Sequence, residues 1–264
     1  MCNCGKGFEC SQKANAIHAQ EVARKMRLEK PFSKDMEKFF SELYAQNKII
    51  FKHSGHTINA TPYIKPFSEL LKKHYKLVLE SFVGVVYDEA TAPKYILPKN
   101  NIVNSVSVSM TRVIDTKAIF TAKTIMENIS GNISELTKET LAELIAAGEV
   151  SSNEVLANLV FDKLIVSAES MSDGIALSEV LNIAEQTKFT EAGEMSKTAD
   201  KPLTKTWRSI LDDRTRSNHA IADGQEQRLT SPFFVGGEYL EYPGDEKGSP
   251  ANTYNCRCGV TYEN

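Results

Sequence analysis

Apolar side chains recur at helical spacing through the first part of the chain. After Pro66 they fall three or four positions apart, at Phe67, Leu70, Leu71, Tyr75, Val78 and Phe82. This period places them on one face of a helix that begins near Pro66, because proline suits the first helical turn. Residues 14–51 also favour a helix through their Ala, Glu, Lys, Met and Leu content, and we expect Pro31 to interrupt it.

A region without periodicity follows these helices. Ala-Pro, Leu-Pro and Asn-Asn pairs lie between Asp88 and Asn104, which predicts a loop and a boundary between two regions. Beyond it, residues 105–109 alternate Ser and Val as a strand would, yet residues 110–129 have a helical composition. We favour a helix for this segment.

Helical patterns continue over residues 134–195. The sequence Ser151-Ser152-Asn153-Glu154 matches a capping box, in which Ser and Glu side chains bind free amides at a helix start. We expect a break at Ser172-Asp173-Gly174. An apolar stripe then continues, and the helical signal fades near Gly193.

The character of the chain changes after residue 200. Turn-forming pairs are frequent in residues 201–264 and separate short apolar pieces. Two of these pieces, Phe233–Val235 and Glu238–Tyr242, read as the strands of a hairpin across Gly236-Gly237. A segment this short with few aliphatic residues has a marginal core, so it needs a metal, a polar network or packing on the helices.

The expected fold class is α+β, with mostly helical N-terminal and central regions and a small irregular α+β module at the C-terminus. We assign residues 1–90 to the N-terminal region, residues 91–200 to the central region and residues 201–264 to the C-terminal module. The composition, 41% hydrophobic and 25% charged over 264 residues, is typical of a globular protein.

The charge balance argues against a protein that binds nucleic acid through its whole surface. The formal net charge is −3 and the pI is about 6.0, whereas phosphate backbones attract basic surfaces. Contacts with DNA would be local, through the Lys-Lys-His-Tyr-Lys sequence at residues 72–76 or through Arg208, Arg214 and Arg216. We favour a solvated helix face for the lysines.

Targeting signals are also missing from the sequence pattern. No apolar run reaches the roughly 18 residues of a membrane span, and residues 1–7 lack the apolar core of a secretory signal. We therefore expect no membrane contact, and folding in a cytoplasm.

Reactive side chains concentrate in one segment near the C-terminus. They comprise one indole, two carboxylates, two guanidinium groups and an imidazole: Trp207, Asp212, Asp213, Arg214, Arg216 and His219. If residues 213–221 are helical, Arg216 and His219 share a face, and Asp212 pairs with Arg216 at i,i+4. One interpretation is a buried polar network, covered by Trp207, that substitutes for a missing apolar core.

A metal site is the second interpretation of this segment. Cys256 and Cys258 with His219 supply sulfur and nitrogen ligands that tetrahedral zinc accepts, and Asp213 or Asp245 is available as a fourth donor. The third interpretation is a Cys/His/Asp catalytic set, but a close cysteine pair in a turn suits ligation or packing better. Geometry disfavours a disulfide between Cys256 and Cys258.

The other three cysteines lie near the N-terminus. Cys2, Cys4 and Cys10 could bind a metal or pair transiently with a partner. Chain termini are usually mobile, so we favour untethered thiols.

An ordered series of short motifs spans residues 204–258. In chain order they are Lys205-Thr206-Trp207, Asp213-Arg214-Thr215-Arg216, His219, Asp223-Gly224, Phe233, Tyr242-Pro243-Gly244-Asp245 and Asn255-Cys256-Arg257-Cys258. Together they resemble the C-terminal signature of the phage Mu F-like head morphogenesis family of minor head, or minor capsid, proteins. That family commonly carries an Ala-Arg-Thr-Glu type helix upstream, whereas this chain reads Ile-Ala-Glu-Gln-Thr-Lys at residues 183–188.

The resemblance implies a tailed-phage or prophage protein, present in few copies, that acts in procapsid assembly with portal and capsid proteins. Some members of the family also contact DNA. The implied location is the virion, in the capsid interior or at the portal vertex, and the host cytoplasm during assembly.

The resemblance implies no known catalytic reaction and no small-molecule substrate, so we expect a protein without enzymatic activity. The alternative is an enzyme or toxin-like effector with a Cys/His/Asp site in the C-terminal module, because family members occur fused to effector domains in some phages. Outside that module the sequence has no phosphate-binding glycine loop, no Gly-x-Ser-x-Gly elbow and no His-Glu-x-x-His pair.

Overall fold

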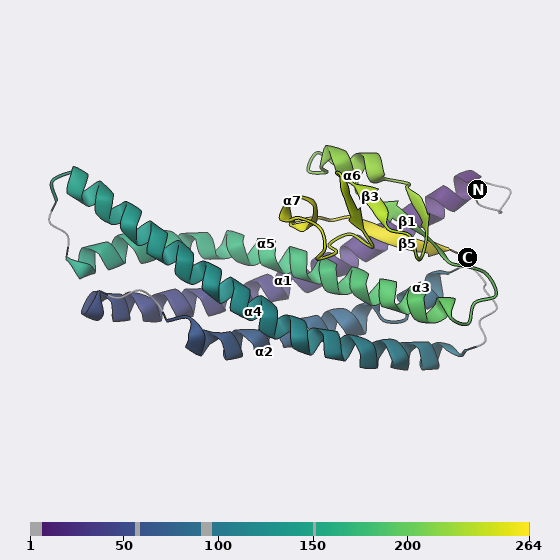
Figure 1. Ribbon diagram of the computed structural model, residues 1–264, viewed down its shortest axis with the longest axis horizontal. Coiled ribbons are helices and arrows are strands. Elements are labelled where there is room, and N and C mark those ends of the chain that lie inside the picture. The colour runs from purple at the N-terminus through teal and green to yellow at the C-terminus, as the bar shows by residue number, and fades with distance from the viewer. Residues whose placement is uncertain (1–6, 56–58, 91–96, 150–151, 264) are drawn as a thin grey trace. The chain divides into compact units, whose positions relative to one another are not determined.

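Long helices make up most of the computed structural model, and all its strands lie near the C-terminus (Figure 1). The structure describes residues 7–55, 59–90, 97–149 and 152–263. The helices are α1 (Gly7–Ser54), α2 (Thr61–Phe82), α3 (Val85–Glu89), α4 (Lys99–Ala146), α5 (Asn153–Ser196), α6 (Ser217–Ala222) and α7 (Pro250–Thr253). The strands are β1 (Thr204–Arg208), β2 (Glu226–Arg228), β3 (Phe233–Val235), β4 (Glu238–Leu240) and β5 (Gly259–Glu263). The expected α+β class is confirmed.

The chain forms two compact units, and each contains parts of α1, α2, α4 and α5. The first unit comprises residues 1–30, 75–112 and 174–264, and the second comprises residues 31–74 and 113–173. All the strands, and with them the candidate functional residues near the C-terminus, belong to the first unit.

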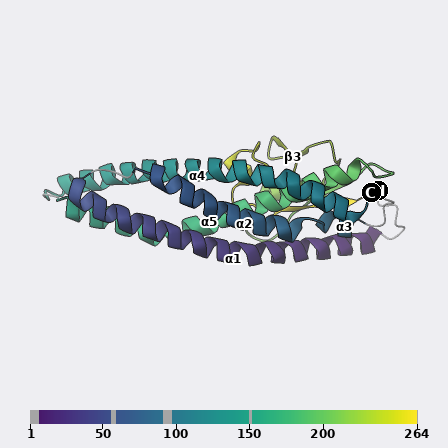
Figure 2. The same cartoon turned by 90° about the horizontal axis from the view of Figure 1, so that it is seen from below.

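Aromatic rings fill the second unit. Phe40 packs on Phe67 at 5.3 Å between ring centroids, so α1 and α2 run side by side here (Figure 2). Phe51 and Phe161 join α1 to α5 in the same way, at 6.1 Å. Since these rings are almost wholly buried, apolar burial is the main force that holds this unit together.

Buried polar contacts join the helices of the first unit. The Glu191 carboxylate on α5 accepts hydrogen bonds from the Gly84 and Tyr87 amides at 2.9 Å each, which fixes the start of α3. The Tyr75 hydroxyl donates to Glu179 at 2.5 Å, and Arg24 donates to the Ser81 carbonyl oxygen at 3.0 Å.

Strand β1 lies between β2 and β5 in an antiparallel sheet. Trp207 faces Val260 across the β1–β5 pair, and its ring is fully buried. Strands β3 and β4 form the predicted hairpin, although the second strand ends at Leu240 rather than Tyr242. Gly236 and Gly237 both have positive φ, 59° and 88°, which a two-residue turn of this kind requires.

Two expected helix breaks are wrong. Pro31 lies inside α1, and the helix continues because the stripe through Phe32, Met36 and Phe40 is fully buried. That burial, about 1.5–3 kcal/mol for each side chain, offsets the cost of about 3 kcal/mol for an internal proline. Gly174 likewise lies inside α5, so the break expected at residues 172–174 is absent.

The remaining expectations for the helices are met in part. Helix α2 begins at Thr61 rather than near Pro66, which lies inside it. Residues 105–109 are helical, as we favoured, but α4 begins at Lys99, within the expected loop. Residues 91–96 and Ser151 lie outside the described residues. The hydroxyl of Ser152 accepts the Val155 amide at 3.3 Å and caps α5, and Glu154 pairs with Lys52 at 3.2 Å.

Candidate metal centre

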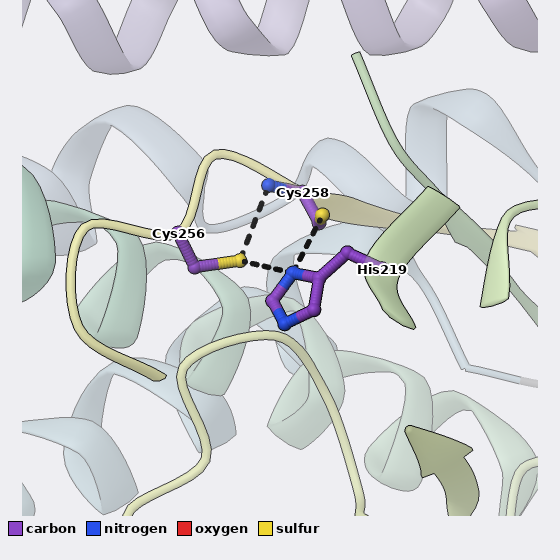
Figure 3. A group of neighbouring side chains, drawn as sticks. All are labelled: His219, Cys256 and Cys258. Atoms are coloured by element: carbon purple, nitrogen blue, oxygen red, sulfur yellow. Dashed lines mark hydrogen bonds between the residues drawn. The ribbon is translucent and has the colours of Figure 1, made fainter. Parts of the chain in front are cut away.

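Helix α6 and the loop before β5 bring His219, Cys256 and Cys258 together (Figure 3). His219 Nδ1 lies 3.5 Å from Cys256 Sγ and 3.4 Å from Cys258 Sγ, and all three donor atoms lie within 4.8 Å of one another. Zinc bonds of about 2.0–2.3 Å in a tetrahedron place nitrogen and sulfur donors about 3.5 Å apart. The donor spacing therefore fits a metal of this type.

The protein environment favours a thiolate at this centre. All three side chains are buried, with at most 3% exposed. Hydrogen bonding with Cys256 first, and then with His219, lowers the pKa of Cys258 to about 5, although burial acts against this shift. The same interaction with Cys258, together with burial, raises the pKa of Cys256. Cys258 is therefore the more readily ionised of the two thiols, and metal binding would displace the thiol protons.

Trp207 and Ser209 support the centre from strand β1 and the residues just after it. The Trp207 ring meets His219 edge-on, at 5.7 Å between centroids, and its Nε1 donates to Ser209 Oγ at 3.2 Å. Ser209 donates to the His219 carbonyl oxygen at 2.8 Å and contacts Cys258 Sγ at 3.4 Å. The sequence analysis missed Ser209, although its position two residues after Trp207 places both on one side of an extended chain.

Asp212 and Arg257 form an ion pair near the centre. Arg257 donates to both Asp212 carboxylate oxygens, at 2.7 and 2.6 Å, and this pairing holds the Asp212 pKa well below its usual range. Only the second part of residues 213–221 is helical, because α6 begins at Ser217. Asp212 instead accepts the Arg214 amide and the Thr215 hydroxyl, a local turn that competes with helix formation.

The expected Asp212–Arg216 pair is therefore absent. Arg216 donates to the Tyr254 carbonyl oxygen at 2.5 Å and so ties the start of α6 to the loop before β5.

The expected fourth metal donors lie apart from the centre. Asp245 is buried, but its oxygens accept the Glu241 and Lys247 amides at 2.9 and 3.1 Å and shape the turn at Pro243. Asp213 is exposed. Of the described residues, only His219, Cys256 and Cys258 form a group of this kind.

The matched region of the chain extends well beyond the C-terminal module. Residues 125–261, just over half of the chain, match the family model described as Phage Mu protein F like protein. The chain belongs to this family. The suspected resemblance is thus confirmed, and the match begins inside α4 rather than near residue 204. The chain has no significant match among curated proteins, and none among solved structures.

Other signature residues of this Phage Mu protein F like chain shape its backbone. Gly224, at φ 76°, donates its amide to the Trp207 carbonyl oxygen at 2.9 Å. Gly244, at φ 81°, lies so close to Leu181 that a Cβ there would approach it to 3.2 Å. Asn255 precedes Cys256 at φ 54°, a left-handed conformation that asparagine tolerates.

A buried ionic cluster, which sequence reasoning missed, lies beneath the centre. It consists of Glu21, Lys25, Glu185 and Lys188, with at most 3% of each residue exposed. Lys25 pairs with Glu185 at 2.5 Å, and Lys188 pairs with Glu21 and, at 3.5 Å, with Glu185. The sequence at residues 183–188, which includes Glu185 and Lys188, departs from the upstream helix typical of the family. This departure was the signal that could have indicated the cluster.

The ionic cluster also holds the strand that follows the cysteines. Lys188 donates to the Val260 carbonyl oxygen at 2.6 Å, and Glu185 accepts the Val260 amide at 3.1 Å. Lys25 donates to the Cys258 carbonyl oxygen at 3.4 Å. Helices α1 and α5 therefore hold the backbone around Cys258 in place.

The two candidate sets of DNA-binding residues differ in their surroundings. Lys72 pairs with Glu69 and Asp115, each at 3.5 Å, and Lys73 pairs with Asp35 at 2.7 Å. Arg208 donates to the Thr261 hydroxyl at 3.2 Å. Among these residues, Arg214 is the most exposed arginine near the centre.

Two further expectations concern the cysteines at the N-terminus and the membrane. Cys2 and Cys4 lie outside the described residues, and Cys10 lies in α1. None of the described helices combines the length and the apolar content that a membrane crossing requires.

Proposed function

We propose that the protein is a minor head protein that acts in phage head assembly, with the portal and the capsid proteins as its partners. Membership of the Phage Mu protein F like family supports this role. The observation that carries the proposal is the buried group of His219, Cys256 and Cys258, which joins α6 to β5 within the matched residues. Such a group suits a module that must stay rigid in order to bind partner proteins.

We further propose that this group binds one zinc ion with a structural role. The nitrogen and two sulfur donors are ligand types that zinc prefers, and their spacing fits its tetrahedral geometry. Bound zinc would displace the thiol protons and cross-link two chain segments, α6 and residues 256–258, of a module whose own apolar core is small.

A role without catalysis agrees with the surroundings of the group. A Cys/His/Asp site needs an aspartate that orients the imidazole, but Asp213 is exposed and Asp245 binds two backbone amides. The hydrogen bonds of Ser209 and the ring of Trp207 fix the donors in place, as they would for a metal with a structural role. We therefore propose assembly, not turnover, as the function.

Metal analysis of the purified, reduced full chain tests the zinc proposal. We expect about one zinc per chain, and none after Cys256→Ser with Cys258→Ser. Because Trp207 is fully buried beside His219, its fluorescence should shift to longer wavelength in the double variant. Cys10→Ser is the matched control and should keep the metal. Wild-type protein that carries no metal and gains none from added zinc would refute this proposal.

Complementation in the phage tests the assembly role. Deletion of the gene should reduce the yield of filled, infectious heads, and the wild-type gene should restore it. The Cys256→Ser, Cys258→Ser gene should fail to do so. Particles from the deletion with normal yield, DNA content and infectivity would exclude the assembly role and favour the effector alternative.

A contact with DNA enters the proposal only as a local one, through Arg214 and its neighbours. It predicts weak retention on DNA that falls steeply as salt rises and that Arg214→Ala abolishes. Unchanged elution of the wild type at low salt would remove DNA from the set of partners.

A further inference from the structure

The candidate metal centre has three protein donors, one fewer than tetrahedral zinc requires. Among the described residues no fourth His, Cys, Asp or Glu joins the group. The nearest expected donors are engaged or exposed, as the contacts of Asp245 and the exposure of Asp213 demonstrate. A metal held here keeps one position for a ligand from outside the described chain.

Three arginines line a small cavity beside the three donors. A cavity of about 10 Å³, room for roughly one water molecule, adjoins all three donors and is also lined by Arg214, Arg216 and Arg257. Asp212 neutralises Arg257, whereas no carboxylate of the described residues pairs with Arg214 or Arg216. Positive charge at this cavity selects an anionic oxygen ligand.

A second, larger cavity shares its wall with the first. Its volume is about 130 Å³, and Arg214, Cys256 and Arg257 line both cavities. Val22 and Met26 of α1 and Leu177 and Leu181 of α5 form the apolar part of the remaining wall, which Lys25 and Glu29 complete. An apolar cavity of about 150 Å³ accommodates benzene, so this one suits a side chain of leucine size.

One acidic group also faces this cavity. Glu29 lines the wall, and burial raises its pKa, while Lys25 and Arg257 act against that shift. When charged, the Glu29 carboxylate repels a bound anion. The preference of the site for an anion therefore depends on the arginines at the shared wall.

We propose that the open metal position receives the C-terminal carboxylate of a partner polypeptide whose last side chain, large and apolar, fills the 130 Å³ cavity. The inference rests on the zinc centre proposed above. A carboxylate and an apolar side chain on one Cα match the arginine-lined cavity and the apolar cavity that share a wall. A DNA phosphate fits less well, because the cysteines are 2–3% exposed and the adjoining wall carries apolar side chains.

Full-length protein loaded with Co²⁺ in place of zinc provides the test, because its visible absorption reports each change in metal ligands. The probe is N-acetyl-leucine, with acetate, N-acetyl-leucinamide and inorganic phosphate as comparisons. We expect N-acetyl-leucine to change the spectrum and to bind at least about tenfold more tightly than acetate, since it buries an apolar side chain. The amide, which lacks the carboxylate, should leave the spectrum unchanged.

Two variants separate the parts of the site without touching the three donors. Arg214→Ala should weaken binding of both carboxylates about tenfold. Val22→Phe should fill the apolar cavity and remove the preference for N-acetyl-leucine over acetate. Both variants should bind Co²⁺ as the wild type does.

The outcomes separate this inference from the zinc proposal. A chain that binds no Co²⁺ or zinc refutes the metal centre and the inference with it. A normal cobalt spectrum that no carboxylate alters overturns the inference alone, and so does equal binding of acetate and N-acetyl-leucine. Phosphate that binds more tightly than N-acetyl-leucine would assign the position to a phosphate ligand instead.

Discussion

In the second compact unit, the largest fully buried side chains are aromatic or apolar, such as Phe40 and Phe67. The core of the first unit contains, besides aromatic side chains such as Trp207, the buried ionic cluster beneath the candidate metal centre. None of the described lysines or glutamates of the second unit is buried to that degree. Apolar packing depends mainly on volume, whereas a buried charge depends on particular partners. The two units should therefore respond differently to substitutions of similar size.

Two substitutions that keep the size of the side chain, one in each unit, should give the largest difference in the free energy of unfolding. Although burial acts against its charge, Glu185 and Glu21 raise the pKa of Lys188, which is therefore charged in the folded protein. Lys188→Met should lower the free energy of unfolding by about 3–5 kcal/mol, because Glu21 loses its partner. Met36→Leu in the second unit should cost less than about 1.5 kcal/mol. Urea unfolding of both variants measures the difference.

A double variant then tests whether charge pairing is the cause. Lys188→Met combined with Glu21→Leu removes both charges and should recover much of the lost stability, since an apolar pair often replaces a buried ion pair at little cost. Lys197→Ala, which breaks an exposed pair with Glu194, is the control and should cost at most about 1 kcal/mol. A double variant less stable than Lys188→Met alone would contradict the comparison.

The pH dependence of stability should also differ between the units. Burial raises the pKa of Glu191, in the first unit, from 4.5 to about 7, although the Tyr87 and Gly84 amides act against this shift. The folded state thus keeps a proton on Glu191 that the unfolded state releases. The contribution of Glu191 to stability is therefore greatest below pH 4.5 and falls as the pH rises to about 7. The loss is about 3 kcal/mol at most.

Urea unfolding at pH 5 and pH 8 checks this effect. Glu191→Gln should be more stable relative to wild type at pH 8 than at pH 5. Asp35, in the second unit, should show the opposite dependence in urea unfolding below pH 3.8, because hydrogen bonds from Lys73 and His74 lower its pKa. Its contribution is complete above pH 3.8 and is lost as pH falls through the lowered pKa. A Glu191→Gln profile parallel to that of wild type would exclude the proposed burial effect.

The same difference explains which parts of the fold could be predicted from the sequence. The helix that carries Phe67 and Tyr75 and the hairpin across Gly236-Gly237 follow from local periodicity and turn chemistry. The continuity of α1 through Pro31 does not, because it depends on burial of residues that flank the proline. Local signals favoured a break that tertiary packing prevents.

The candidate site likewise has parts that could be predicted from the sequence and parts that could not. The residue types of His219, Cys256 and Cys258 indicated a metal site, and these side chains do lie together. Asp212, however, pairs with Arg257, 45 residues away, rather than with Arg216 on a shared helix. Lys25 and Glu185 are 160 residues apart, so no local pattern could have paired them. Pairings this distant in sequence require the tertiary structure.

The smallest expected effect compares two glycines inside long helices. A Cβ at Gly131, in α4 of the second unit, would have no atom within 4 Å, whereas one at Gly174, in α5 of the first unit, would lie 2.5 Å from the Tyr254 hydroxyl oxygen. Gly131→Ala should raise the free energy of unfolding by about 0.5–1 kcal/mol, because alanine loses less backbone entropy on folding.

Gly174→Ala should give no such gain in stability, because the Tyr254 side chain must move to make room for the added methyl group. Tyr254 also accepts, through its carbonyl oxygen, the hydrogen bond that holds Arg216 beside the candidate metal centre. Gly193→Ala is the matched control in the first unit: its Cβ would also meet nothing within 4 Å, and it should stabilise as Gly131→Ala does. Thermal unfolding of the three variants decides between a local clash and a general property of α5. If Gly174→Ala stabilised as much as the other two, the close approach of Tyr254 would not constrain this helix.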